Sequence, residues 1–151
     1  MKLSTRSRYG TRMVLTLAER YEDGPVRIGT IAKLLDISVK YLEQLIIPLK
    51  KAQLIKSIRG PKGGHSLAKS PDDITVGEIV KILEGGIDLS DCVGDLESCS
   101  NTGHCVVRGV WEDATNAMYD KLNSVTFSQM IEKGRNVQSI GNSRGLINQC
   151  T

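Results

Sequence analysis

The chain has 151 residues, of which 40% are hydrophobic, 4% aromatic and 25% charged, and its net charge is +3. This length supports one hydrophobic core with an extension, and the scarcity of aromatic rings predicts an aliphatic core and argues against a base-stacking surface for single strands. No apolar run approaches the roughly 20 residues of a transmembrane helix, and no secretory signal follows Met1, so we expect a cytoplasmic protein without membrane contact.

The charge is divided between the two halves of the chain. Residues 1–69 carry 14 Lys and Arg against 5 Asp and Glu, a net of +9, whereas residues 70–151 carry 6 against 12, a net of −6. A basic half is the electrostatic signature of a partner with a phosphate backbone, because each neutralised phosphate releases counterions. The alternative is an ordinary solvated surface.

Three helices are predicted in the basic half. Ser4 is suited to cap a first helix whose apolar stripe runs from Tyr9 to Tyr21. A second helix is predicted over 28–35. Ser38 is a good N-cap for a third that begins at Val39, in which Val39, Leu42, Ile46 and Leu49 are expected to face inward. Pro48 should kink or end that third helix, because it lacks the N–H that the helix needs.

Two short helices joined by a tight turn indicate a helix-turn-helix, whose second helix enters the major groove of DNA. The outward positions near the start of that helix are Lys40, Tyr41, Glu43 and Gln44. Glu accepts from cytosine, Gln pairs with adenine, and Lys contacts guanine or phosphate. The alternative is that these side chains are only the solvated face of a surface helix.

A hairpin is predicted directly after the third helix. Its strands cover 54–59 and 65–68, and the glycine-rich turn over 60–64 joins them. A hairpin in this place is a wing, and Arg59 and Lys62 at its tip can reach a minor groove or its phosphates. His65 is interpreted as a partly exposed strand residue.

The acidic half begins with a capping box at Thr75 that opens a fourth helix, and a second box at Thr126 opens a short helix anchored by Phe127. Between them, a long helix after Cys105 carries one apolar stripe: Val107, Val110, Trp111, Ala114, Ala117, Met118 and Leu122. Such a stripe is suited to pair with a second copy across a two-fold axis, and the alternative is packing on the chain's own core. Trp111 and Phe127 are expected to be packing anchors.

Three of the four cysteines lie in one stretch, Cys92, Cys99 and Cys105, separated by six and then five residues, and Cys150 stands apart. Val93 and Leu96 are too few apolar residues to offset the roughly 1 to 2 kcal/mol per residue that ordering a loop costs. Zinc sites usually take two ligands from a tight turn, whereas this irregular sulfur spacing suits an iron-sulfur cluster. Two disulfides, or unrelated thiols, are the alternatives.

Several motifs together resemble a known family. They are M-K-L-S-T-R-S-R-Y-G at 1–10, Y-L-E-Q-L at 41–45, S-I-R-G-P-K-G-G at 57–64 and T-V-G-E-I at 75–79, completed by Cys92, Cys99, Cys105 and Trp111. Over about residues 1–133 the chain is similar to the iron-sulfur cluster regulators of the IscR, NsrR and CymR type. The resemblance implies a dimeric winged-helix transcription factor. Its recognition residues would be Ser38, Lys40, Tyr41, Glu43 and Gln44, with Arg59 of the wing in the minor groove.

Two positions depart from this family. The histidine ligand of IscR is Arg108 here, and the acidic residue that NsrR-type members supply from the partner's first helix is Arg8 here. The first cysteine spacing also exceeds the IscR pattern by one residue, and CymR-type members lack the cysteines, which argues against a pure cysteine-metabolism role. The fourth cluster ligand stays open among several candidates: His104, Asp91, Asp95, Glu97, Cys150 and an exogenous molecule.

These features predict a mainly α-helical protein with a small β-hairpin wing. Its expected parts are a winged helix-turn-helix over 1–85, a linker and cysteine loop over 86–105, a dimerisation helix and short following helix over 106–133, and a polar tail over 134–151. We predict a homodimer that binds palindromic duplex DNA and controls genes such as those for cluster assembly according to iron-sulfur cluster status. A non-cysteine fourth ligand favours 2Fe-2S over 4Fe-4S.

Two other functions are compatible with parts of the pattern. One is a repressor of the same family that responds to nitric oxide or redox state and has different target genes. The other is an electron carrier or metalloenzyme with an incidental basic surface, which predicts no sequence-specific binding to duplex DNA. The sequence has no paired-carboxylate arrangement and no Ser/His/Asp set, so we do not expect an enzyme.

Overall fold

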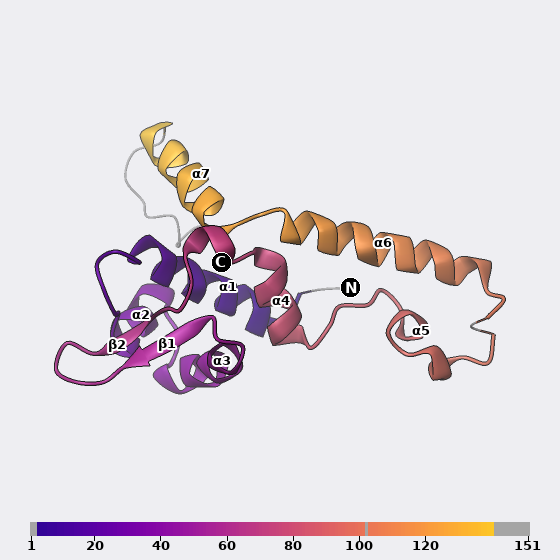
Figure 1. Ribbon diagram of the computed structural model, residues 1–151, viewed down its shortest axis with the longest axis horizontal. Coiled ribbons are helices and arrows are strands. Elements are labelled where there is room, and N and C mark those ends of the chain that lie inside the picture. Colours follow the sequence, from indigo (N-terminus) through magenta and orange to yellow (C-terminus); the bar gives the residue numbers. More distant parts are fainter. Residues whose placement is uncertain (1–2, 102, 141–151) are drawn as a thin grey trace.

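The structure of the chain is a computed structural model that describes residues 3–101 and 103–140. Its elements in chain order are α1 (Thr5–Glu19), α2 (Ile28–Leu35), α3 (Val39–Lys51), β1 (Ile55–Ile58), β2 (Gly64–Leu67), η1 (Pro71–Asp73), α4 (Val76–Glu84), α5 (Asp91–Gly94), η2 (Leu96–Ser98), α6 (Val106–Asn123) and α7 (Phe127–Ile140). Figure 1 shows a head formed by α1 to α4, the hairpin and α7, from which α6 extends as an arm with α5 beside its far end. The expected fold class, mainly α with a two-stranded hairpin, is confirmed.

Polar side chains fix where the predicted helices begin. Three predicted caps each accept a hydrogen bond from the backbone N–H three residues later: Ser4, Ser38 and Thr75. Thr126 and Gln129 cap each other reciprocally, because each backbone N–H donates to the other's side chain, at 3.2 and 3.3 Å. These bonds satisfy N–H groups that have no partner inside the helix, so the predicted helix starts are confirmed.

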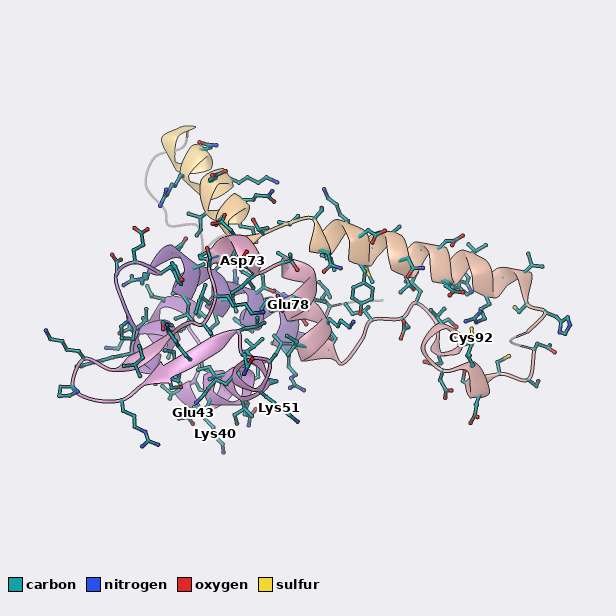
Figure 2. All side chains as sticks on the ribbon, viewed as in Figure 1. Lys40, Glu43, Lys51, Asp73, Glu78 and Cys92 are labelled. Carbon is teal, nitrogen blue, oxygen red and sulfur yellow. The ribbon has the colours of Figure 1, made fainter. Side chains whose placement is uncertain are left out.

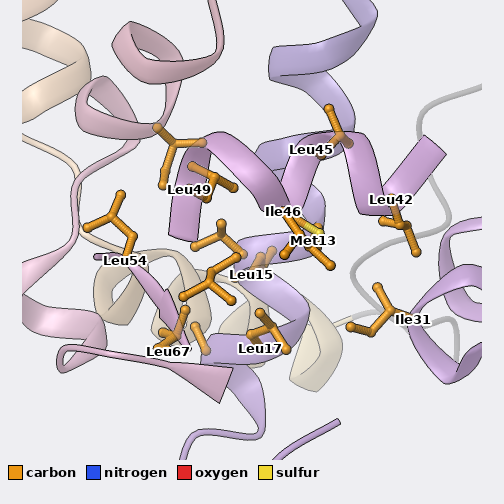
Figure 3. Packing of buried hydrophobic residues seen from close by; sticks show 14 of the residues in the cluster. Met13, Leu15, Leu17, Ile31, Leu42, Leu45, Ile46, Leu49, Leu54 and Leu67 are labelled. Carbon is orange, nitrogen blue, oxygen red and sulfur yellow. The ribbon is translucent and has the colours of Figure 1, made fainter. Parts of the chain in front are cut away.

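The hydrophobic core lies around α1, which α2, α3, α4, α7 and the hairpin enclose (Figure 3). Its fully buried side chains are almost all aliphatic: Met13, Val14, Leu17, Ile31, Leu42, Leu45, Leu49, Leu54, Leu67, Ile74, Ile79 and Phe127. Each contributes roughly 1.5 to 3 kcal/mol by leaving water. Phe127 is the only aromatic ring in this set, so its predicted role as a core anchor is confirmed.

The wing is joined to the helix-turn-helix by backbone contacts. β1 and β2 pair antiparallel with Ser57 opposite His65. Val26, just before α2, exchanges two backbone hydrogen bonds of 2.8 Å with His65. Gly64 makes this approach possible, since a Cβ there would lie 2.4 Å from the Val26 carbonyl oxygen. The wing is therefore fixed to the start of α2 rather than held by its own two strands alone.

The linker from the head runs along one face of α6. The Ile87 N–H donates to the Tyr119 hydroxyl at 2.5 Å, and the Leu89 N–H donates to Thr115 Oγ1 at 3.3 Å. Thr115 is buried by this contact, whereas Trp111, one turn before it on the same helix, is 43% exposed. Trp111 is therefore no core anchor of the single chain, and its expected place in a dimer interface stays a prediction.

Four local expectations are wrong. Tyr21 is 41% exposed because α1 ends at Glu19, before it, and Val39 is 39% exposed because the first turn of α3 lies outside the core. Pro48 lies inside α3, which continues to Lys51, so loss of one ladder bond in the last turn does not end a helix packed along its whole length. α7 continues past 133 to Ile140, so the predicted tail begins too early. The tail residues from 141 onward lie outside the described residues.

Within the described ranges, no helix combines the length and the apolar character that crossing a membrane requires.

Candidate DNA interface and cysteine arm

The third helix, α3, presents polar side chains on the face opposite the core. Leu42, Leu45, Ile46 and Leu49 point inward, and this leaves Lys40, Glu43 and Gln44 exposed. Ser38 caps the helix by accepting from the Tyr41 N–H at 3.2 Å, so it lies at the same end. Figure 2 shows Lys40 and Glu43 along the outer edge of the head, beside the wing. The predicted recognition residues therefore gather at the start of one exposed helix face.

Tyr41 differs from its neighbours because its ring is partly buried. It meets the ring of Tyr9 edge to face, with centroids 6.1 Å apart, and the Arg12 guanidinium lies 5.8 Å from the Tyr9 centroid. Burial raises the pKa of the Tyr41 hydroxyl, so this group stays protonated and can donate a hydrogen bond. The contact with α1 orients the Tyr41 side chain, which periodicity alone did not reveal.

The wing tip carries the second predicted group of basic residues. Arg59 and Lys62 are both exposed, on either side of Gly60 and Pro61. Arg27 is the residue just before α2, and its guanidinium donates a hydrogen bond to the Pro61 carbonyl oxygen at 2.6 Å. A side chain that sequence reasoning missed therefore reaches the turn of the wing.

His65 lies at the base of the wing. Its Nδ1 is 3.1 Å from Ser57 Oγ, directly across the hairpin. Partial burial, together with the nearby positive charge of Lys50, lowers the pKa of His65, and Glu43 opposes this shift. The predicted position, a partly exposed strand residue, is confirmed.

The three cysteines of the loop lie at the far end of the arm. Cys92 is half-buried in α5, with its Sγ 3.2 Å from Ser90 Oγ, whereas Cys99 and Cys105 are exposed. No disulfide joins these three described cysteines to one another. Among the described residues, no three His, Cys, Asp or Glu side chains are gathered closely enough to hold a metal ion. The predicted ligands thus share one loop but are not assembled into a coordination site. Cys150 lies outside the described residues.

Arg108 holds this loop against α6. Its Nε donates to the Cys92 carbonyl oxygen at 2.9 Å, and its Nη1 lies 3.3 Å from Glu112 Oε2, one turn along the helix. Among the candidate fourth ligands, Asp95 accepts from the Glu97 N–H at 2.9 Å, and Asp91 and His104 are exposed. Arg108 therefore acts on the backbone of the loop, a role that the sequence pattern did not indicate.

The outer face of α6 forms an apolar stripe with no cover in the described chain. Val107 is 54% exposed, Val110 57% and Trp111 43%, and Ala114 is exposed beside them, while Met118 is half-buried. The linker runs along the flank of α6 formed by Thr115 and Tyr119, and it leaves these side chains of the stripe exposed. The stripe is therefore accessible to another molecule.

A wing fixed beside a helix-turn-helix, with polar side chains at the start of the exposed second helix, defines a winged-helix DNA-binding protein. Comparison with known proteins gives its family. The Rrf2 family model, described as an iron-dependent transcriptional regulator, matches residues 3–133. The protein rrf2 of Nitratidesulfovibrio vulgaris is 44% identical over 131 residues, 87% of each chain. The chain belongs to the Rrf2 family of transcription regulators.

Solved structures agree with this assignment. The chain is similar to CymR, the global cysteine regulator of B. subtilis, with 36% identity and a TM-score of 0.73 over 88% of this chain and 98% of that one. It is similar to T. potens IscR with 34% identity and a TM-score of 0.74 over 96% of this chain and 94% of that one. These relatives are transcription regulators, so the expectation that the chain is not an enzyme is confirmed.

Proposed function

We propose that this Rrf2-family regulator is a cytoplasmic homodimer that changes its DNA affinity when a cluster binds the cysteine arm. The observation that carries the proposal is the placement of three thiols on one exposed loop, at the end of an arm that is continuous with the DNA-binding head. A tenfold change in affinity requires only about 1.4 kcal/mol, which reordering a loop of this length can supply.

We propose that the two heads of the dimer each bind one half of a palindromic operator. Lys40, Glu43 and Gln44 would meet base edges in the major groove, with Ser38 and Tyr41 beside them, and Arg59 and Lys62 would contact the minor groove or its phosphates. All of these side chains except Tyr41 are exposed, and Lys40 and Glu43 lie along the outer edge of the head in Figure 2, which supports this assignment. Arg59→Ala should weaken operator binding in a fluorescence anisotropy titration while the unfolding midpoint changes little. Unchanged binding would remove the wing from the interface.

The donor set of the arm fits an iron-sulfur cluster chemically. Neither α5 nor η2 contains a buried residue, so packing does little to order the loop around Cys92, Cys99 and Cys105. Three thiolates would hold the cluster, whose iron atoms supply the coordination positions that draw them together. A non-cysteine fourth ligand favours a 2Fe-2S cluster over 4Fe-4S, with control of genes such as those for cluster assembly.

The test compares cysteine variants with a matched loop variant. Cys92→Ala, Cys99→Ala and Cys105→Ala should each reduce the visible absorbance and the iron and sulfide content of anaerobically purified protein. Ser100→Ala, an exposed residue in the same loop, should not. Promoter discrimination should change with the cysteine variants only. Identical operator binding by reconstituted and metal-stripped protein would refute cluster sensing.

The exposed Cys99 and Cys105 also favour a second candidate, a repressor that responds to nitric oxide or redox state and has other target genes. Accessible thiolates and their clusters react readily with such molecules. Treatment with nitric oxide should then release operator DNA at concentrations that leave the unfolding midpoint unchanged. Release by cluster loss alone, with no response to nitric oxide, would favour cluster-status sensing.

A further inference from the structure

A basic depression lies between the start of α2 and the base of the wing. Its volume is about 520 Å³, and its lining includes three groups that carry or can accept positive charge, Arg27, Lys33 and His65. None of the described residues that line it is acidic. An anion that entered this depression would therefore meet positive side chains from two elements without an opposing carboxylate in the wall.

This basic depression lies at the base of the wing, near the proposed DNA interface. The charges of Lys50 and Glu43, both in α3, act on the pKa of His65, so the base of the wing lies close to the exposed flank of α3. Arg59 and Lys62 lie in the turn between β1 and β2, and His65 lies in β2. A DNA strand that contacted the recognition helix and the wing would therefore pass near the depression.

The walls of the depression are held in place before any ligand binds. The Arg27 guanidinium is bonded to the Pro61 carbonyl oxygen, and the His65 ring lies 3.1 Å from Ser57 Oγ. Arg27 uses one of its N–H donors in this bond, and a guanidinium has five. Beside Gly29, which also lines the depression, the space is open, since nothing lies within 4 Å of the position of a Cβ. Fixed donors lose little side-chain entropy on binding, which favours a charge-assisted contact with an oxyanion.

We infer that this basic depression binds a phosphate group of the DNA backbone, outside the base pairs read by α3, through Arg27 and Lys33 with His65 beside them. The inference rests on the proposed DNA interface and adds a contact that carries no sequence information. A bound phosphate would also oppose the burial and the Lys50 charge that lower the pKa of His65. The contact fixes the register of the head on the duplex and increases affinity for every sequence alike.

A matched pair of lysine variants tests the inference. Lys33→Gln and Lys81→Gln each remove one exposed lysine from the last turn of a helix, α2 and α4 respectively. Lys33→Gln should weaken binding to the operator and to unrelated duplex by the same factor, and should lower the salt slope of log K by about 1 per head. Lys81→Gln should leave the salt slope at the wild-type value. Equal slopes for the two variants would overturn the inference.

Arg27 variants separate charge from wing position. Arg27→Gln should lower the salt slope as Lys33→Gln does, and Arg27→Lys should restore it because the charge returns. If Arg27→Lys stays as defective as Arg27→Gln, the residue acts by holding Pro61 and the phosphate assignment fails for Arg27. The measurement is anisotropy with labelled operator over a series of salt concentrations.

A titration with inorganic phosphate tests whether the depression binds free phosphate or a phosphate of the DNA backbone. Titration of the full chain with inorganic phosphate, followed by NMR of Gly29 and His65, should give only weak, millimolar binding. Tight saturation, with no Lys33→Gln effect on DNA, would assign the depression to a free phosphate and overturn the backbone contact. Operator discrimination that survives in Lys33→Gln would leave the recognition helix assignment intact, so the two proposals fail separately.

Discussion

At the scale of single residues, Glu84 ties the N-terminus of the head to the end of α4. One carboxylate oxygen, Oε1, accepts from the Ser4 backbone N–H at 3.0 Å and from the Ser4 hydroxyl at 2.6 Å. Desolvation raises the pKa of Glu84, but the hydrogen bonds from Ser4 and the charge of Arg6 outweigh it, so the pKa is lowered. The charged form is therefore the one that stabilises the fold.

The effect of Glu84 on stability follows from the direction of this pKa shift. A carboxyl whose pKa is lower in the folded state contributes stability above its unfolded pKa and loses it as the pH falls through the folded one. Glu84→Gln should reduce the free energy of unfolding at pH 7 by about 1 kcal/mol, and the difference should shrink as the pH falls below about 4.5. Urea denaturation at several pH values measures this difference.

Glu78→Gln is the matched control for Glu84→Gln. Glu78 lies in the same helix, but its ion pair with Lys69 spans 3.8 Å between side chains that are 35% and 45% exposed, so its loss should change the free energy of unfolding by less than about 0.5 kcal/mol. If the two variants lost equal stability at pH 7, the hydrogen bonds between Glu84 and Ser4 would stabilise the fold no more than the ion pair of Glu78 with Lys69 does.

Arg108 is the residue that ties the cysteine loop to α6. Arg108→Ala removes the bond to the Cys92 carbonyl oxygen and should increase amide hydrogen exchange in 91–95 several-fold, because packing there is sparse. The unfolding midpoint of the head should not change. Glu112→Gln breaks only the ion pair and should preserve the slow exchange. Slow exchange that persisted in Arg108→Ala would show that other contacts order the loop.

At the scale of elements, the wing depends on a close backbone approach at Gly64. Gly64→Ala would place a Cβ 2.4 Å from the Val26 carbonyl oxygen, a backbone atom that cannot rotate away. We expect a loss of about 1 to 3 kcal/mol in the free energy of unfolding, with weaker operator binding, because the bridge between Val26 and His65 must open. Thermal unfolding and anisotropy measure the two effects.

Gly109→Ala provides the control for Gly64→Ala. A Cβ at Gly109, inside α6, meets nothing within 4 Å, so this change should stabilise by roughly 0.5 to 1 kcal/mol. Equal stability of Gly64→Ala and wild-type protein would mean that the wing moves away from α2 at no cost.

The elements of the head could be predicted because their signals are local. Ser38 and Thr75 mark helix starts through their own side chains, and the stripe on α3 follows from periodicity. Periodicity does not predict the exposure of Tyr21 and Val39, because burial at a helix end depends on which neighbours cover it, and it does not predict that packing carries α3 past Pro48. The contacts of Arg27 with Pro61 and of Arg108 with Cys92 join residues distant in sequence, and no local pattern specifies them. The three cysteines of the loop could be identified from their spacing, but spacing does not specify whether their side chains come together, and among the described residues they are not assembled into a site.

At the scale of the whole molecule, the head and the arm meet at a narrow junction. Gly85 ends α4 with φ of 80°, Gly86 follows with φ of 122°, and the linker then turns along α6. Both glycines adopt a backbone conformation that favours residues without a Cβ, so the chain can change direction sharply between the two parts. If the cysteines sense a cluster as proposed, α6 and this linker are the covalent route from the cysteine loop to the head of the same chain.

The outer stripe of α6 gives the last prediction, which concerns self-association. If the proposed dimer forms through this stripe, Trp111 is its largest side chain and should dominate the interface, as aromatic anchors do. Trp111→Ala should weaken self-association by about 30-fold or more, equivalent to roughly 2 kcal/mol, without lowering the unfolding midpoint of the head. Sedimentation equilibrium measures the association constant.

Asn116→Ala separates the stripe from a general effect on α6. Asn116 is exposed on the same helix but away from the stripe, so its removal should leave the association constant unchanged. Weaker dimerisation should also reduce affinity for a full palindrome more than for a half-site, because only the palindrome engages both heads. If Trp111→Ala protein stayed dimeric and bound both DNAs as the wild type does, the two heads would be joined through another surface, and the arm would carry its cysteines without contributing to the dimer.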